Sequence, residues 1–329
     1  MIRLDRYSFK PLALFTLGLC CLVSGKLVEA QTIAVFTKNM ANPNYVALRL
    51  GADRAAAAMG AKTYHRVPKK PDDPVEQIEL LSALPQEKPD ALIFNPADEK
   101  RLAEPFSRYV APLGIPVINI VNRAAGYGDK IAFVGADDEL VGYATAKYLF
   151  RAMDGKGSIV ILEGTPTAVT AVDRLRGFHR ALSESPGIRV VASVNGKYLR
   201  PDGLAAMQTV LAKDIAFDAI LGANDLMALG ALDAMDAAGR DSKRVKAVGI
   251  NGIPEAIAAI ESGRLLATED YDGFKLGCIS AMATIRHMRG LPVPRNINLP
   301  VAMIDKSNYT AWKIPLQERQ CPSWEQLVK

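Results

Sequence analysis

From Thr32 onward, short apolar or β-branched runs alternate with longer stretches of helical periodicity, and this alternation limits the possible folds more than any other feature. Parallel strands need a crossover of a dozen or more residues, which is usually a helix. The alternation therefore predicts an α/β protein with parallel sheets. The expected strands are 33–36, 61–66, 91–94, 116–121, 131–135, 158–164, 189–194, 219–223, 245–250 and 265–270, and the expected helices are 44–59, 73–84, 98–112, 138–153, 171–184, 201–213, 225–239, 254–262 and 273–289.

One connection between predicted strands is too short to hold a helix. Only the loop NRAAGYGDK (122–130) separates strands 116–121 and 131–135, so this loop is a candidate passage from one sheet to a second. With 329 residues and 49% hydrophobic content, the chain is long enough for two lobes. We expect two doubly wound parallel-sheet lobes, joined by hinge strands and facing each other across a ligand cleft. The expected division is an N-terminal lobe of residues 31–136 plus 272–300 and a C-terminal lobe of residues 137–271 plus 301–329.

The first thirty residues differ in composition from the rest. Basic residues precede an apolar run at 11–25, and Val28 and Ala30 stand at the −3 and −1 positions of a cut after Ala30. This pattern predicts a cleavable secretory signal peptide over residues 1–30. A membrane anchor is the alternative, but roughly 15 apolar residues are fewer than the ~20 that span a bilayer. Lipid attachment at Cys20 or Cys21 is also disfavoured, because Leu19 rather than a small residue precedes Cys20.

Removal of the signal leaves two cysteines, Cys278 and Cys321. An oxidising compartment permits them to form a disulfide. Cys278 falls inside a predicted helix, and no feature of the sequence sets its distance from Cys321. The sequence therefore favours two unpaired cysteines over a disulfide.

Charge and motif content argue against several classes of function. The net charge of +5 is spread along the chain, and the longest basic block is Lys69-Lys70, which disfavours nucleic-acid binding. The only histidines are His65, His179 and His287, and the chain lacks GxSxG, HExxH and phosphate-binding glycine motifs. We expect neither an enzyme nor a metal or cofactor site.

Amide and tyrosine residues follow the predicted strands, where open α/β sheets bind their ligands. Each asparagine has a simpler interpretation as a helix cap or turn residue. Several such asparagines at the strand ends of two sheets suggest a site for a neutral ligand dense in hydroxyl groups, because an amide both donates and accepts hydrogen bonds. Arg123 would add charge-assisted donors or form a surface ion pair. The tyrosines would stack on a ring or pack in the core. The residues concerned are Asn42, Asn44, Tyr45, Asn95, Asn122, Arg123, Tyr198, Asn224, Asn251 and Tyr271.

Several motifs together are similar to those of a known family. They are Asn42-Pro43, Asn95-Pro96-Ala97-Asp98, Asn122-Arg123, the run 174–178 (RLRGF), the run 224–231 (NDLMALGA) and the run 248–252 (VGING). On these motifs the chain resembles the ribose-binding-protein-like group of periplasmic sugar-binding proteins, over essentially its whole mature length. The resemblance implies the type I periplasmic binding fold and a role as the solute receptor of an ABC importer.

The resemblance also implies roles for single residues. Asn42, Asn44 and Tyr45 correspond to first-lobe contacts, and Asn95 and Arg123 to hydroxyl-binding residues of the same lobe. In the second lobe Asn224 matches an amide that binds ring hydroxyls, Tyr198 a stacking aromatic and Tyr271 a hinge-adjacent polar residue. The pair at 224–225 is expected to be a ligand-facing asparagine followed by a helix-capping aspartate.

Three departures from the family pattern bear on the ligand. Asn122 and Asn251 stand where the family has aspartates, and a comparison without gaps puts Val172 where pentose-binding members have arginine. Amides hold neutral hydroxyls less strongly than carboxylates do. This disfavours ribose itself and leaves a polyol, a modified sugar, or a sugar acid paired with Lys38 or Arg123.

The expected partners are therefore a sugar or polyol and the membrane permease of an ABC importer, and the expected location is the periplasm. A receptor that feeds a chemotaxis or signalling sensor is the alternative. A sugar-responsive transcription repressor core is more remote, because it needs a DNA-binding helix-turn-helix where residues 1–30 have a signal. Residues 308–324 show little periodicity, and we expect them to wrap back over a lobe without an assigned role.

Overall fold

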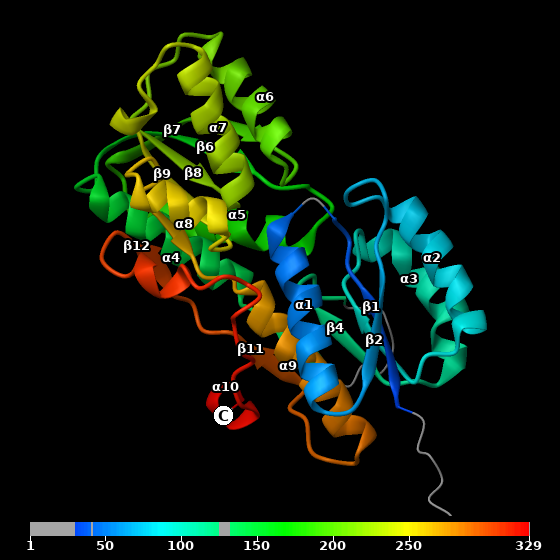
Figure 1. The fold of residues 1–329 in the computed structure, drawn as a ribbon. Coiled ribbons are helices and arrows are strands. Elements are labelled where there is room, and N and C mark those ends of the chain that lie inside the picture. Colours follow the sequence, from blue (N-terminus) through cyan, green and yellow to red (C-terminus); the bar gives the residue numbers. More distant parts are fainter. Residues whose placement is uncertain (1–29, 41, 125–131, 329) are drawn as a thin grey trace, which may run out of the picture.

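The computed structural model describes residues 30–40, 42–124 and 132–328, so the signal peptide predicted for residues 1–30 lies almost wholly outside the described residues (Figure 1). The strands form two six-stranded sheets, with the orders β11-β5-β4-β3-β1-β2 and β12-β10-β9-β8-β6-β7. The pairings are parallel except for β10 with β12. The predicted fold class, two parallel-sheet lobes of an α/β protein, is confirmed.

The first lobe is built on the first sheet. Its strands are β1 (Thr32–Phe36), β2 (Lys62–Arg66), β3 (Ala91–Phe94), β4 (Val117–Ile120), β5 (Ala132–Gly135) and β11 (Asn296–Asn298), and its helices are α1 (Pro43–Ala58), α2 (Pro74–Glu87), α3 (Glu99–Tyr109) and α9 (Gly273–Met288). Helices α1 and α9 pack so closely that a Cβ atom at Gly277 would collide with the backbone of Leu48. These two helices therefore form one rigid layer of the lobe.

The second lobe repeats this plan. Its strands are β6 (Gly157–Glu163), β7 (Ile188–Asn195), β8 (Ala219–Gly222), β9 (Lys246–Ile250), β10 (Ala267–Glu269) and β12 (Met303–Asp305), and its helices are α4 (Asp138–Ala152), α5 (Val169–Ser183), α6 (Arg200–Leu211), α7 (Asp225–Ala237) and α8 (Pro254–Glu261). Short 3₁₀ turns occur at Ala111–Leu113, Ser242–Arg244 and Tyr309–Trp312, and α10 (Trp324–Leu327) ends the fold. The predicted helices and strands are confirmed to within a few residues.

The expectation that residues 122–130 lead from one sheet to the other is wrong. Strands β4 and β5 pair in parallel within the first sheet, with Ile118 opposite Ala132 and Ile120 opposite Val134. Each of these strands has only four residues, and a strand that short rises by about 13 Å. The roughly eleven residues between them are long enough to return along that length without a helix.

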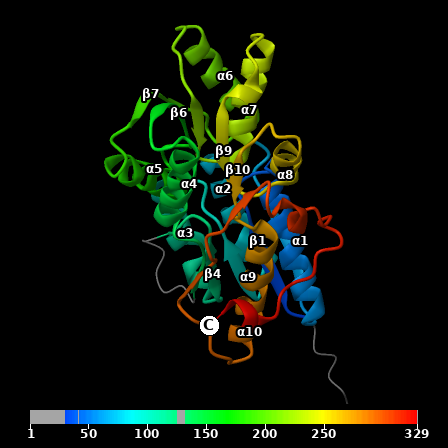
Figure 2. The ribbon, with the colours of Figure 1, turned by 90° about the vertical axis from the view of Figure 1, so that its left-hand side faces the viewer.

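The chain passes between the lobes at three adjacent places. Residues 136–137 connect β5 to α4, residues 270–272 connect β10 to α9, and residues 299–302 connect β11 to β12. The three segments are hydrogen-bonded to one another, because Leu299 N donates to Gly135 O at 2.7 Å and Asp270 N donates to Ala302 O at 2.8 Å. Figure 2 shows the two lobes stacked above each other around these segments. They form the hinge.

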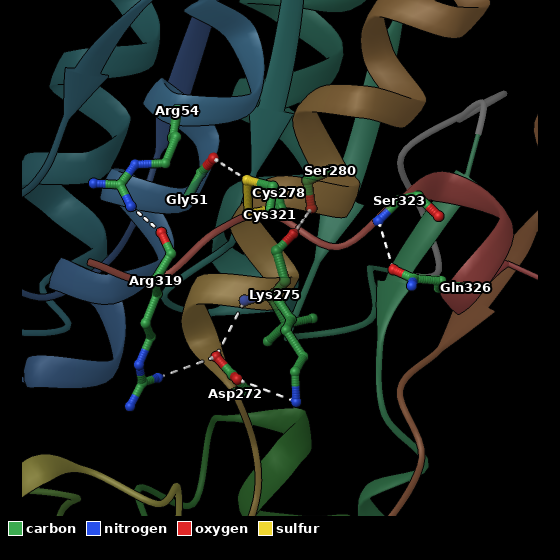
Figure 3. The surroundings of a disulfide bond; sticks show 11 residues. Gly51, Arg54, Asp272, Lys275, Cys278, Ser280, Arg319, Cys321, Ser323 and Gln326 are labelled. Atoms are coloured by element: carbon green, nitrogen blue, oxygen red, sulfur yellow. Dashed lines mark hydrogen bonds and ion pairs between the residues drawn. A yellow bond between two sulfur atoms is a disulfide. The ribbon is translucent and has the colours of Figure 1, made fainter. Parts of the chain in front are cut away.

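The structure joins Cys278 and Cys321 in a disulfide, contrary to the expectation of two unpaired cysteines (Figure 3). Their Cα atoms are 5.6 Å apart, a separation common for disulfides. The sequence could not provide this distance, because it depends on where the chain runs after β12. From Gln317 onward the tail lies on the first lobe, whereas the expected division assigned all of residues 301–329 to the second.

Strands β11 and β12 were not predicted, because each has only three residues and no periodic pattern. Among the described residues, no helix has both the length and the apolar character needed to cross a membrane.

Candidate ligand-binding site

Loops from the carboxyl ends of strands in both lobes surround one pocket. The first lobe contributes Lys38, Asn39, Asn42, Asn44, Tyr45, Asp72 and Val121, the second contributes Thr170, Arg174, Tyr198, Asn224 and Asn251, and Tyr271 comes from the hinge. Eight of the eleven residues expected at the site therefore lie around this pocket.

In the first lobe, the loop between β1 and α1 orients its asparagines by local hydrogen bonds. Asn42 caps α1, and its Oδ1 accepts from Asn44 N at 2.9 Å. Asn44 Oδ1 in turn accepts from Gly273 N at 2.9 Å, which ties this loop to the start of α9. Tyr45 lies beside them and is buried, and burial, together with the charge of Asp72, raises the pKa of its hydroxyl.

In the second lobe, Asn224 lines the pocket as expected, but it also caps the helix, which was the role expected for Asp225. Asn224 caps α7, since its Oδ1 accepts from Met227 N at 2.9 Å, and its Nδ2 donates to Tyr198 O at 2.9 Å. Asp225 is fully buried and accepts from Thr268 Oγ1 at 2.6 Å and from Ile253 N at 3.1 Å. Asn224 thus lines the pocket while holding the loop that carries Tyr198, and Asp225 joins the start of α7 to β10 and to the loop that follows β9.

Arg174 is the main pocket residue that the sequence did not predict. Its side chain is buried, its Nε donates to Asp138 Oδ1 at 2.8 Å, and its Nη1 donates to Ala223 O at 2.8 Å. Burial raises the pKa of Asp138 to about 6, although the charge of Arg174 opposes the shift. Val172, which a comparison without gaps matched to the arginine of pentose-binding members, lies on the surface and is 47% exposed. Thr170, one turn before Arg174 on α5, also lines the pocket. The spacing of these two polar residues on one helix face is the sequence signal that could have identified Arg174.

Two aromatic rings, one from the hinge and one from the second lobe, lie close to the guanidinium of Arg174. Its central carbon lies 5.0 Å from the ring centre of Tyr271 and 5.9 Å from that of Tyr198. The Tyr198 hydroxyl lies 3.3 Å from Thr170 Oγ1. The Tyr271 hydroxyl is buried, and among the described residues it has no hydrogen-bond partner.

Three predicted residues do not line the pocket. Asn95 and Asn122 are buried behind it, where Asn122 N donates to Asn95 Oδ1 at 3.3 Å and Asn122 Nδ2 donates to Pro96 O at 2.9 Å. Arg123 is exposed, donates to Asn296 Oδ1 at 2.8 Å and stacks 3.7 Å from the ring centre of Phe133. Val121, directly before Asn122 and Arg123, has a left-handed φ of 59°, which redirects the chain at the end of β4.

Strained backbone is concentrated at the pocket. Val121, Tyr198 and Asn251 have φ values of 59°, 64° and 133°, and such conformations cost non-glycine residues about 1–3 kcal/mol each. Asn251 is held in place by a backbone hydrogen bond to Glu269 O at 2.9 Å. Strain of this kind is typical of functional sites, where the surrounding structure maintains it.

Comparison with known proteins agrees with this geometry. Residues 33–292 match the periplasmic binding protein domain. The chain belongs to the periplasmic binding protein family. The D-ribose/D-allose-binding protein of Pseudomonas aeruginosa is 30% identical over 278 residues, which cover 82% of this chain and 85% of the relative. A ribose import binding protein of Bacillus subtilis is 28% identical over 272 residues, covering 83% and 86%.

Among solved structures, a solute-binding protein of an ABC transporter from Actinobacillus succinogenes, crystallised with D-allose, has a TM-score of 0.79 and 28% identity. The similarity covers 85% of this chain and 99% of that one. Since these relatives are binding proteins, the prediction that the chain is not an enzyme is confirmed. The predicted resemblance to the ribose-binding group is confirmed as well.

Proposed function

We propose that this periplasmic binding protein captures a sugar or polyol between its two lobes and delivers it to an ABC-type permease after export by the N-terminal signal. The observation that carries the proposal is that residues of both lobes line one buried pocket. The relatives named above bind or import ribose or allose, which supports this class of ligand.

The chemistry of the pocket favours an uncharged ligand rich in hydroxyl groups. Its lining mixes asparagine amides with the hydroxyls of Thr170 and Tyr271, and each of these groups both donates and accepts hydrogen bonds. The charges are balanced by protein groups, because Arg174 pairs with Asp138 and Lys38 lies near Asp72. The ring faces of Tyr198 and Tyr271 offer apolar surface for the C–H groups of a sugar ring.

Contacts between the lobes indicate how closure is coupled to binding. Thr170 N lies 3.5 Å from Asn122 Oδ1, and Lys38 Nζ lies 5.7 Å from the ring centre of Tyr198. A ligand that touches both lobes would add its own contacts to these and so stabilise the closed arrangement.

Calorimetric titration with D-ribose, D-allose, D-tagatose and myo-inositol, together with small-angle scattering, tests the proposal. We expect at least one of these probes to bind and to reduce the radius of gyration. Tyr271→Phe should weaken that probe about tenfold by removing one buried hydroxyl, while Arg123→Ala, outside the pocket, should bind it normally. Absence of both binding and compaction across the panel would contradict the proposal.

A further inference from the structure

Asp72 lines the pocket from the loop between β2 and α2, which the sequence did not connect with binding. Its Oδ1 lies 3.7 Å from Lys38 Nζ, and both side chains are largely buried. Hydrogen bonds between such atoms are about 2.7–3.2 Å long, so Lys38 and Asp72 form an ion pair without a direct hydrogen bond. Among the described residues, Asp72 Oδ1 has no hydrogen-bond partner.

Backbone interactions hold this carboxylate in position. Asp72 N donates to Lys38 O at 2.8 Å, and the residue adopts a left-handed φ of 58°. The next residue, Asp73, caps α2 by accepting from Val75 N at 2.8 Å. Asp72 is therefore placed beside Lys38 by the turn itself and not by its own side-chain interactions.

We propose that Lys38 and Asp72 bind the same hydroxyl group of the ligand. The hydroxyl oxygen accepts a hydrogen bond from the ammonium of Lys38, and its proton is donated to Oδ1 of Asp72. This arrangement satisfies two buried charges, which are costly without hydrogen bonds. At this position of the ligand, a methyl ether cannot donate a hydrogen bond, and a deoxy carbon can neither donate nor accept one. A carboxylate there is repelled by Asp72. The inference rests on the proposed function and makes Asp72 a specificity-determining residue.

The test uses whichever probe of the panel binds the wild-type protein most tightly, together with its monodeoxy analogues. Asp72→Asn and Lys38→Met should each weaken the parent probe at least tenfold, because hydrogen bonds to charged groups are stronger than neutral ones. For the deoxy analogue that lacks the shared hydroxyl, the same substitutions should change the affinity less than twofold. Lys69→Met, an exposed lysine in the same loop, is the control.

Equal weakening of the parent and of every deoxy analogue would overturn the shared-hydroxyl arrangement, as would wild-type affinity in Asp72→Asn. Failure of the wild-type protein to bind any probe would instead refute the proposed function.

A second observation, independent of the ligand, concerns the tail. After β12, Lys306 Nζ donates to Glu261 O at 2.6 Å and Lys313 Nζ pairs with Glu261 Oε1 at 2.7 Å, so this part is anchored to α8 of the second lobe. The chain then returns to the first lobe, where Arg54 Nη2 donates to Gln317 O at 2.9 Å.

Beyond Gln317 the attachment to the first lobe becomes covalent (Figure 3). Arg319 Nη1 lies 3.8 Å from Asp272 Oδ1, and Cys321 is bonded to Cys278 on α9. Between the two anchors, Leu316 and Arg319 line a small cavity that is also lined by residues of both lobes. The tail therefore crosses the hinge side of the cleft as a fourth connection between the lobes.

We infer that this fourth connection, residues 306–321, is a strap that limits how far the lobes separate when no ligand is bound. The disulfide makes its first-lobe end permanent, and at its second-lobe end, which continues from β12, the contacts with Glu261 hold residues 306–313 reversibly. Opening must stretch the strap or release the second anchor, so the ligand-free protein is kept in a narrower range of opening than the three hinge segments alone would allow.

Small-angle scattering of the ligand-free protein tests the strap by releasing either end. Cys278→Ala/Cys321→Ala removes the covalent attachment to the first lobe, and Lys306→Met/Lys313→Met releases residues 306–313 from α8 while leaving the disulfide intact. Both variants should have a larger radius of gyration than the wild-type protein. Lys69→Met again serves as the control. An unchanged radius in both double variants would overturn the inference, and an increase in the cysteine variant alone would show that the disulfide acts by stabilising α9 and not through a strap.

Discussion

Substitution of Asp225 by asparagine should change how the stability of the protein depends on pH. The carboxylate is fully buried at the start of α7 and accepts hydrogen bonds from Thr268 and Ile253. Burial raises its pKa from the ordinary 3.8 to about 7, although these hydrogen bonds oppose the shift. The folded protein therefore keeps the proton to a higher pH than the unfolded chain.

The sign and size of the effect follow from proton linkage. Between pH 3.8 and about 7 the folded state binds more protons at this residue than the unfolded state, so the free energy of unfolding falls as pH rises. Each pH unit in this window is worth about 1.36 kcal/mol. Between pH 5 and pH 8, this group changes the stability only over the two pH units below its folded-state pKa, so the free energy of unfolding falls by about 3 kcal/mol.

Urea unfolding at pH 5 and pH 8 measures this contribution. The amide of an asparagine at this position cannot titrate, so Asp225→Asn should lose about 3 kcal/mol less stability over this interval than the wild-type protein. Asp214→Asn makes the same chemical change at an exposed position and serves as the control. Parallel pH profiles for the wild type and Asp225→Asn would refute the reasoning. They would show that the two hydrogen bonds and the positive end of α7 keep the buried carboxylate ionised.

Three further predictions concern other parts of the fold. Loss of the disulfide in Cys278→Ala/Cys321→Ala should lower the free energy of unfolding by about 4 kcal/mol, because the bond closes a loop with a sequence separation of 43; urea unfolding with and without reductant checks this, and a loss below about 1 kcal/mol would contradict it. Gly277→Ala should cost about 1–3 kcal/mol in thermal unfolding, since the added methyl collides with α1, and an unchanged melting temperature would show that the helices move apart freely. Arg123→Ala should lower stability by less than about 1 kcal/mol, the value of an exposed cation–π contact, and should leave ligand affinity within twofold in calorimetry; a tenfold loss would place Arg123 at the site after all.

Features that depend on neighbouring residues were predictable from the sequence. Hydrophobic periodicity located the helices and ten of the strands, because burial of one helix face or of a whole parallel strand leaves a local pattern. The strand ends also indicated the region of the pocket, since open α/β sheets bind ligands at that edge. Lys38, Asn42, Asn44, Tyr45, Tyr198, Asn224, Asn251 and Tyr271 all lie around the pocket for this reason.

The tertiary structure decided which side chains face the pocket. Arg123 was expected inside but lies outside, because the left-handed backbone at Val121 turns the chain away. Arg174 enters the pocket from the face of α5 that also carries Thr170, and Asp72 enters it from a turn; which helix face and which turn reach the pocket depends on the packing of distant segments. Asp225 does not cap α7 as expected but is buried against Thr268, more than forty residues later, which donates a hydrogen bond to the aspartate.

The same distinction explains the larger errors. Pairing of β4 with β5 and of Cys278 with Cys321 brings together segments that no local pattern relates. Periodicity and capping are properties of a few successive residues, and the sequence by itself determined them. Sheet order, the course of the tail and the orientation of each pocket side chain depend on the packing of distant segments against one another, so only the folded structure decided them.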